Sequence, residues 1–138
     1  MKILFYRYGN ICEPDIIDGF EELAHTVSQI TEQINNKNME FGAYAKIVGQ
    51  YLLDHPHDCV FTVNFFPLIS DVCNIFKIPY ICWSVDSPVL EFFAKSVQNS
   101  CNRIFYLIMP SMKKSHRLTL DTYFTFLLLQ MLKVSNKP

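Results

Sequence analysis

The sequence predicts an α/β fold: a Rossmann-like, doubly wound parallel sheet with helices on both faces. Three observations predict it. Half of the 138 residues are hydrophobic, which is enough to build a core. Strand-like and helix-like segments alternate along the chain. The inner strand-like segments are continuous apolar runs, as expected for strands that are buried on both faces.

Each element follows from a local pattern. The first helix-like segment places Ile16, Ile17, Phe20 and Leu23 at helical spacing, with acidic residues on the opposite face. A proline ends the second helix, and prolines stand in the first turn of the third and fourth. The predicted strands cover residues 2–8, 26–30, 59–65, 79–85 and 103–108, and the predicted helices cover 15–25, 38–56, 67–76 and 87–98. Right-handed crossovers would bring the carboxyl ends of the strands to one edge, where such folds bind ligands.

Composition argues against several classes of protein. A formal net charge of −1 argues against a protein built to bind nucleic acid. We find no apolar signal region at the start and no run of about 18 apolar residues that would predict a transmembrane helix, so we expect a cytoplasmic protein. The five cysteines are scattered and odd in number, which favours free thiols over a disulfide framework. His55 and His57 have a spacing seen in metal sites, but they lie in a polar turn, and we expect neither a metal nor a cofactor.

Polar residues after the predicted strands form the candidate site. Asp86 ends an apolar run, and two interpretations stay open: it caps the following helix, or it faces a cleft with Trp83 and contacts a polar ligand. Asn64 and the turn at 8–10 carry the same ambiguity, and that turn has too few glycines for a dinucleotide fingerprint. No catalytic residue can be assigned from spacing alone. The candidates for a cleft are Asn10, Asn64, Trp83, Asp86 and Ser87.

The end of the chain differs from the rest. Residues 1–102 contain twelve acidic and six basic residues, whereas 103–138 contain six basic residues and one acid, Asp121. We therefore expect a Rossmann-like domain at 1–105 and an atypical tail at 106–138. Loss of one base in a thymine run at Ile104-Phe105 would explain the change, and this hypothesis makes the tail an out-of-frame extension. The alternative is a natural, basic amphipathic helix at about 122–134.

The segment "VNFFPLISDVCNIFKIPYICWSVDSPVLEFF", with its W-x-x-D-S-P strand end, resembles the N-terminal domain of CgeB-type (spore-maturation-like) bacterial glycosyltransferases. The resemblance covers roughly residues 1–105. It implies the acceptor-side half of a two-Rossmann (GT-B) enzyme that acts on a nucleotide-sugar and an acceptor without a bound metal. The donor-binding domain would be missing, so we expect a truncated fragment that transfers no sugar alone and self-associates through exposed apolar surface.

Two other classes of function compete with this interpretation. The first is a stand-alone Rossmann-like or receiver-like module that binds a ligand or a partner. A phospho-accepting receiver would need an acidic cluster after the first strand and an aspartate after the third, where this chain has Tyr8-Gly9-Asn10 and Asn64. The second is a structural protein that docks through its tail.

Overall fold

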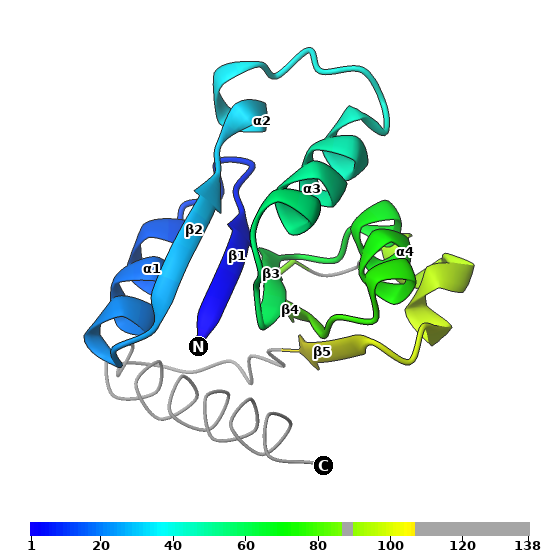
Figure 1. Cartoon of the computed structure of the whole chain (residues 1–138). Helices are drawn as coiled ribbons and strands as arrows, with labels where there is room; N and C mark the ends of the chain where they lie inside the picture. The colour runs from blue at the N-terminus through cyan, green and yellow to red at the C-terminus, as the bar shows by residue number, and fades with distance from the viewer. Residues whose placement is uncertain (87–89, 107–138) are drawn as a thin grey trace, which may run out of the picture. The chain divides into compact units, whose positions relative to one another are not determined.

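A computed structural model describes residues 1–86 and 90–106 (Figure 1). Strands and helices alternate through this part of the chain, in agreement with the predicted rhythm. Their bounds, in chain order, are β1 Lys2–Tyr6, α1 Glu13–Glu22, β2 Thr26–Ile30, α2 Glu32–Asn35, α3 Ala43–Asp54, β3 Cys59–Val63, α4 Pro67–Phe76, β4 Tyr80–Ser84, the 3₁₀ helices η1 Leu90–Phe93 and η2 Lys95–Gln98, and β5 Asn102–Tyr106.

The five strands form one parallel sheet in the order β2-β1-β3-β4-β5. The chain winds outward from β1 in one direction to β2 and in the other to β3, so the switch in direction lies between β1 and β3. This order is the flavodoxin-like version of a doubly wound sheet, and ligands of such sheets bind at the switch point. The predicted fold class is confirmed.

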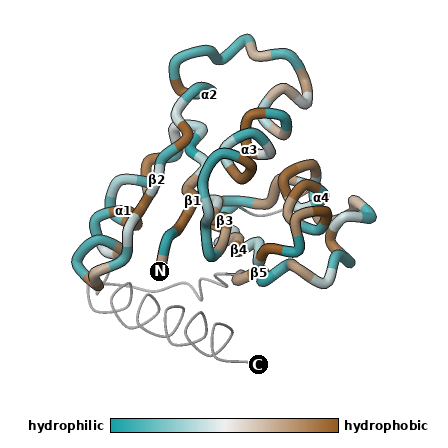
Figure 2. The backbone as a smooth tube through the Cα atoms, viewed as in Figure 1, coloured by the Kyte–Doolittle hydropathy of each residue, from teal (hydrophilic) through white to brown (hydrophobic). Residues whose placement is uncertain are grey.

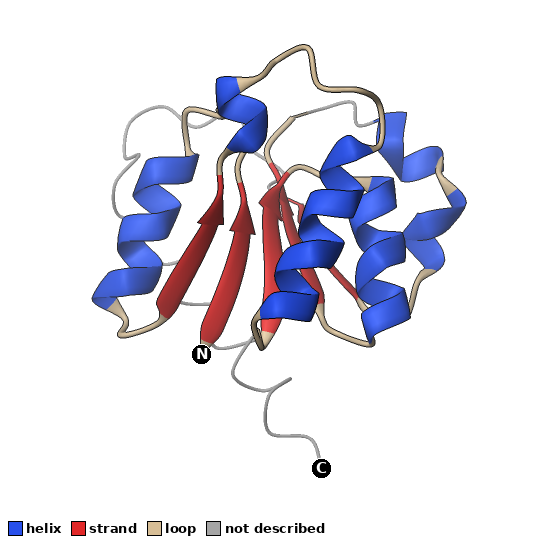
Figure 3. Cartoon of the chain, turned by 45° about the horizontal axis from the view of Figure 1, so that its top comes forward, coloured by secondary structure: helices blue, strands red, loops and turns tan. Residues whose placement is uncertain are grey.

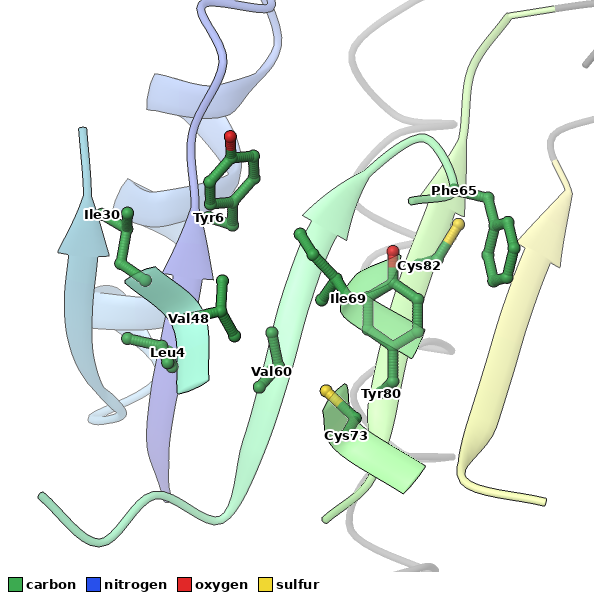
Figure 4. Close-up of a cluster of buried hydrophobic side chains, with 10 residues drawn as sticks. All are labelled: Leu4, Tyr6, Ile30, Val48, Val60, Phe65, Ile69, Cys73, Tyr80 and Cys82. Carbon is green, nitrogen blue, oxygen red and sulfur yellow. The ribbon is translucent and has the colours of Figure 1, made fainter. Parts of the chain in front are cut away.

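Helices cover both faces of the sheet (Figure 3). On one face, Val48 of α3 and Ile69 of α4 pack against strand residues in a buried cluster (Figure 4). The strand members of that cluster include Leu4, Tyr6, Val60, Tyr80 and Cys82. On the other face, Phe20 of α1 meets Phe61 of β3, with ring centroids 5.1 Å apart.

Hydrophobic residues, brown in Figure 2, recur along the strands and the helices. Every residue of β3 and of β4 is buried, and their runs CVFTV and YICWS carry the core on both faces. In α1 the buried positions include Ile16, Ile17 and Phe20, which share one side of the helix. Burying this much apolar surface is the main favourable term for the fold.

Some predicted boundaries are wrong. The predicted helix 87–98 is replaced, in its described part, by η1 and η2, with Ala94 extended between them (φ −69°, ψ 145°). Side chains compete with helical bonding there: Asn102 donates to the carbonyls of Ser96 and Val97, and Asp71 accepts from the Ser96 hydroxyl. Strand β3 ends at Val63, two residues early, because Asn64 takes the left-handed conformation with φ 62°. Of the predicted tail, residues 107–138 lie outside the described residues.

Two further findings concern membranes and thiols. Within residues 1–86 and 90–106, no helix is both long and apolar enough to cross a membrane. All five cysteines lie in this part of the chain and are free, as expected, and Cys59, Cys73 and Cys82 are buried.

Candidate functional site at the carboxyl edge of the sheet

The carboxyl ends of β1, β3 and β4 meet beside the switch point, and the loops that follow them form the candidate site. Parallel pairing sets this meeting: Tyr6 of β1 lies opposite Thr62 of β3, and Val63 lies opposite Trp83 of β4. The residues two positions further along β1 and β3 are Tyr8 and Asn64. Their side chains are hydrogen-bonded, with 2.8 Å between Asn64 Nδ2 and the Tyr8 hydroxyl oxygen.

Asn64 connects all three loops through its amide side chain. Its Nδ2 donates to the Tyr8 hydroxyl oxygen and to a carboxylate oxygen of Asp86, at 2.8 and 2.5 Å. Its Oδ1 accepts from the backbone N–H groups of Val85 and Asp86, at 3.0 and 3.3 Å. An amide has two N–H donors and two acceptor lone pairs, so this side chain is fully used. An aspartate could not reproduce the pattern, because a carboxylate donates nothing.

The left-handed backbone of Asn64 suits the same role. Asparagine visits this region more readily than most residues. In this conformation its own backbone N–H donates to the Trp83 carbonyl at 2.9 Å, and its carbonyl accepts from the Thr62 hydroxyl at 2.6 Å. The residue is therefore fixed at both backbone and side chain.

The hydroxyl of Tyr80 supports the loop from below. Tyr80 is fully buried, and its hydroxyl accepts from the Phe66 backbone N–H at 3.0 Å. The same oxygen lies 2.7 Å from the Thr62 hydroxyl. Burial keeps the pKa of Tyr80 well above its ordinary value, so the group stays neutral. A buried polar chain of this kind sets the position of residues 64–66.

Glu13 holds the loop after β1. It is completely buried at the start of α1, where the helix dipole favours a negative charge. Its two carboxylate oxygens accept from the backbone N–H groups of Tyr8 and Gly9, at 2.9 and 3.2 Å, and from Arg7 Nε at 3.3 Å. The Gly9 backbone, with φ 97°, turns the chain toward the helix.

Tyr8 presents a hydrogen-bond donor to the site. Its hydroxyl oxygen accepts from Asn64 and, at 3.0 Å, from Asn10 Nδ2, and its own proton has no acceptor among the described residues. Burial is the largest cause that raises the pKa of Tyr8, and the nearby Asp86 carboxylate adds to it. The hydroxyl therefore stays protonated at neutral pH and is free to donate to a ligand.

An open pocket of about 650 Å³ lies at this edge. Its size is within the usual range for small-molecule sites. Five aromatic residues line it, among them Tyr8, Tyr44 and Phe66, which form an aromatic wall. Asn64, Asp86 and Glu91 add polar side chains. The ring centroids of Tyr8 and Tyr44 are 5.4 and 5.7 Å from that of Phe66.

The predicted cleft residues have different places. Asn64 and Asp86 line the pocket, and Asn10 reaches it only through Tyr8. Asn10 also accepts from the Cys12 backbone N–H at 3.0 Å, so it shapes the turn. Trp83 is 7 % exposed and is not among the residues that line the pocket. Ser87 lies outside the described residues, and with it the predicted N-cap.

Sequence reasoning missed Glu13 and the aromatic wall. A glutamate a few residues after a glycine turn reads as an ordinary acid in the first turn of a helix. Tyr44 falls within the predicted helix 38–56, and Phe66 falls between the predicted strand 59–65 and the predicted helix 67–76. The pairing of β1 with β3 brings the loop after β1 close to the loop after β3. This pairing cannot be read from the sequence. Within residues 1–86 and 90–106, no group of three or more histidine, cysteine or acidic side chains is arranged to hold a metal.

Comparison with known proteins finds solved structures of similar fold. The chain resembles the N-terminal domain of a response regulator/sensory box/GGDEF 3-domain protein from Carboxydothermus hydrogenoformans, with a TM-score of 0.58 and 12% sequence identity. The match covers 97% of this chain and 99% of that chain. No protein-family model matches the sequence. No curated protein matches it either. At this level of identity the likeness shows the fold alone.

The resemblance to CgeB-type glycosyltransferases is wrong. The structural match is to the domain of a response regulator, and it replaces the interpretation as a truncated half of a GT-B enzyme. The residues that suggested the family have local explanations. Trp83 is a buried strand residue, and Asp86 accepts a hydrogen bond from Asn64 at the strand end. Such features recur wherever a parallel strand ends beside a ligand edge.

Proposed function

We propose that this chain is a binding module of the signalling type, with receiver-like topology, that takes a small ligand at its carboxyl edge and accepts no phosphoryl group. The proposal rests chiefly on Asn64. It stands at the end of β3, where a phospho-accepting receiver needs an aspartate, and its amide is fully used in holding three loops together.

The loop after β1 supports the same conclusion. A phospho-accepting site needs acidic side chains there to hold a divalent cation. This loop reads Arg7-Tyr8-Gly9-Asn10, and the nearby carboxylate of Glu13 is buried and bonded to Arg7 and to two backbone N–H groups. The residues that the topology brings to this position are thus suited to shaping a pocket, not to binding a metal.

The pocket supplies the binding part of the proposal. It combines apolar walls with a few convergent polar groups, which is the usual make-up of small-molecule sites. The Tyr8 O–H group offers a hydrogen-bond donor and the Asp86 carboxylate offers an acceptor, and together they could orient a ligand. We place the protein in the cytoplasm, because the buried free thiols of Cys59, Cys73 and Cys82 suit a reducing compartment. Self-association through exposed apolar residues stays a prediction.

Two measurements on the full chain test the proposal. Incubation with acetyl phosphate and Mg²⁺, followed by intact mass spectrometry, should leave the mass unchanged. A phosphoryl adduct on an acidic side chain at this edge would overturn the proposal. Amide NMR spectra recorded with a fragment library should show shifts confined to Tyr8, Val85 and Asp86 and their neighbours. If no fragment perturbs these amides in the folded protein, the binding module is refuted.

The variant Asn64→Asp sharpens the first test. It introduces an acidic residue at the end of β3. The new carboxylate would lie beside that of Asp86, because Asn64 Nδ2 is 2.5 Å from an Asp86 oxygen in the wild-type chain. Like charges at that distance raise the pKa of one carboxyl group. We expect the variant to be less stable than wild type at pH 7 and to recover stability, relative to wild type, as the pH is lowered toward 5. It should still gain no phosphoryl group.

A further inference from the structure

We infer that the ligand of this pocket is a small organic cation, a quaternary or protonated amine. This inference rests on the proposed function and names the chemical class of ligand for the same site. The charged side chains that the described part of the chain brings to the pocket are Asp86 and Glu91, and both are acidic. Anions such as nucleotides would meet these carboxylates without a described basic partner.

The aromatic wall provides the second part of the argument. Tyr8, Tyr44 and Phe66 come from three different segments and line one pocket. The planes of Tyr8 and Tyr44 are inclined at 61° and 73° to that of Phe66, so the rings pack edge to face and not in a flat stack. Because all three residues line the same pocket, an ammonium group bound there could contact more than one ring. Each contact is favourable because the face of an aromatic ring is electronegative.

The protonation states fit a cation as well. Burial raises the pKa of Tyr8 and of Tyr44, so both rings are neutral phenols at physiological pH. Among the described residues, the carboxylate of Asp86 accepts a side-chain hydrogen bond from Asn64 on one oxygen, and the other oxygen has no partner there. Asp86 and Glu91 are both exposed, so they can meet an arriving ligand without a large cost of desolvation. The aromatic rings would contact the cation directly, and the carboxylates would make the pocket prefer a positive charge.

Choline and its neutral carbon analogue 3,3-dimethylbutan-1-ol form a matched pair for the test, because they have the same shape and differ in charge. Titration of each into the full-length protein, followed by amide NMR at Tyr8, Val85 and Asp86, gives their relative affinities. We expect the neutral analogue to bind about ten-fold more weakly, because both the cation–π contacts and the attraction of the two carboxylates are lost. Inorganic pyrophosphate should leave the same amides unshifted.

Three variants locate the effect. Asp86→Asn and Glu91→Gln should each lower the affinity for choline about three-fold, which is the effect expected for an exposed charge pair. Neither variant should change the affinity for the neutral analogue. Tyr44→Leu should reduce the preference for choline over the neutral analogue several-fold. Glu22→Gln removes an exposed charge on α1, away from the pocket, and should change nothing.

The outcomes separate this inference from the proposed function. Equal binding of choline and the neutral analogue, or binding of pyrophosphate at these amides, would overturn the cation and leave the binding module standing. No binding of choline would also overturn it, and the fragment library then decides whether the module binds anything. If both charge variants and Tyr44→Leu keep the same preference for choline, then other residues recognise its positive charge and the assignment to this pocket is wrong.

Discussion

The buried carboxylate of Glu13 gives the sharpest test of how the loop after β1 is held. The change Glu13→Gln keeps the shape of the side chain but removes the charge and converts one oxygen into an NH₂ group. In the better orientation, the remaining oxygen keeps the partners of Oε2, which are Arg7 Nε and the Gly9 N–H. The new NH₂ group then faces the Tyr8 N–H, 2.9 Å from the replaced oxygen.

The cost follows from these contacts. One buried N–H loses its acceptor, which costs about 1–3 kcal/mol, and two bonds to a charged oxygen become neutral ones. Arg7 is 22% exposed at its side chain, so water compensates part of its loss. We expect Glu13→Gln to lower the free energy of unfolding by about 2 kcal/mol. Glu13→Ala leaves all three donors without their acceptor and should cost about 3–5 kcal/mol.

Urea unfolding, followed by circular dichroism, measures both changes. Asp15→Asn is the matched control, because Asp15 lies in the same first turn of α1 but is exposed. It should change the free energy of unfolding by less than about 0.5 kcal/mol. If Glu13→Gln is as mild as Asp15→Asn, then the carboxylate does not hold the loop and the account of this site is wrong.

Three further predictions use other parts of the core and the surface. Tyr80→Phe removes the buried acceptor of the Phe66 N–H, so denaturant titration should show a loss of about 1–3 kcal/mol; no loss would mean that water replaces the hydroxyl. Burial and the neighbouring N-terminal ammonium lower the pKa of His25, so the folded state favours the neutral ring. The free energy of unfolding should therefore fall as the pH drops below about 6.5. His25→Gln should reduce this pH dependence in thermal melts at pH 5 to 8. Burial raises the pKa of Cys59 to about 12, so this thiol should resist labelling by a disulfide reagent at pH 8 in the native protein and react in urea; rapid native labelling would contradict its burial.

The fold was predictable because its signals are local. The runs at β3 and β4 are almost wholly apolar, as expected for strands that are buried on both faces. The prediction of a helix at 87–98 was wrong because the conformation of this segment depends on residues that are distant in the sequence. Asp71 and Asn102 bond to the segment 96–99 from α4 and β5, and no local pattern announces these contacts.

The site was predictable only in part. Asn64 and Asp86 could be placed at the edge, because each follows an apolar run in a parallel sheet. The side on which Trp83 lies was not settled by that argument. Successive strand residues point to opposite faces, and the neighbouring Cys82 belongs to the cluster beneath α3 and α4. Trp83 therefore points to the other face, that of α1, and not into the pocket.

Asn64 has one more consequence. A single amide side chain hydrogen-bonds the loop after β3 to the loops after β1 and β4, so a shift of Asn64 changes contacts of all three loops. A molecule that draws Asp86 away from Asn64 also frees the Val85 and Tyr8 contacts to rearrange. The backbone hydrogens of residues 85 and 86 would then exchange with solvent faster than those of the strand behind them.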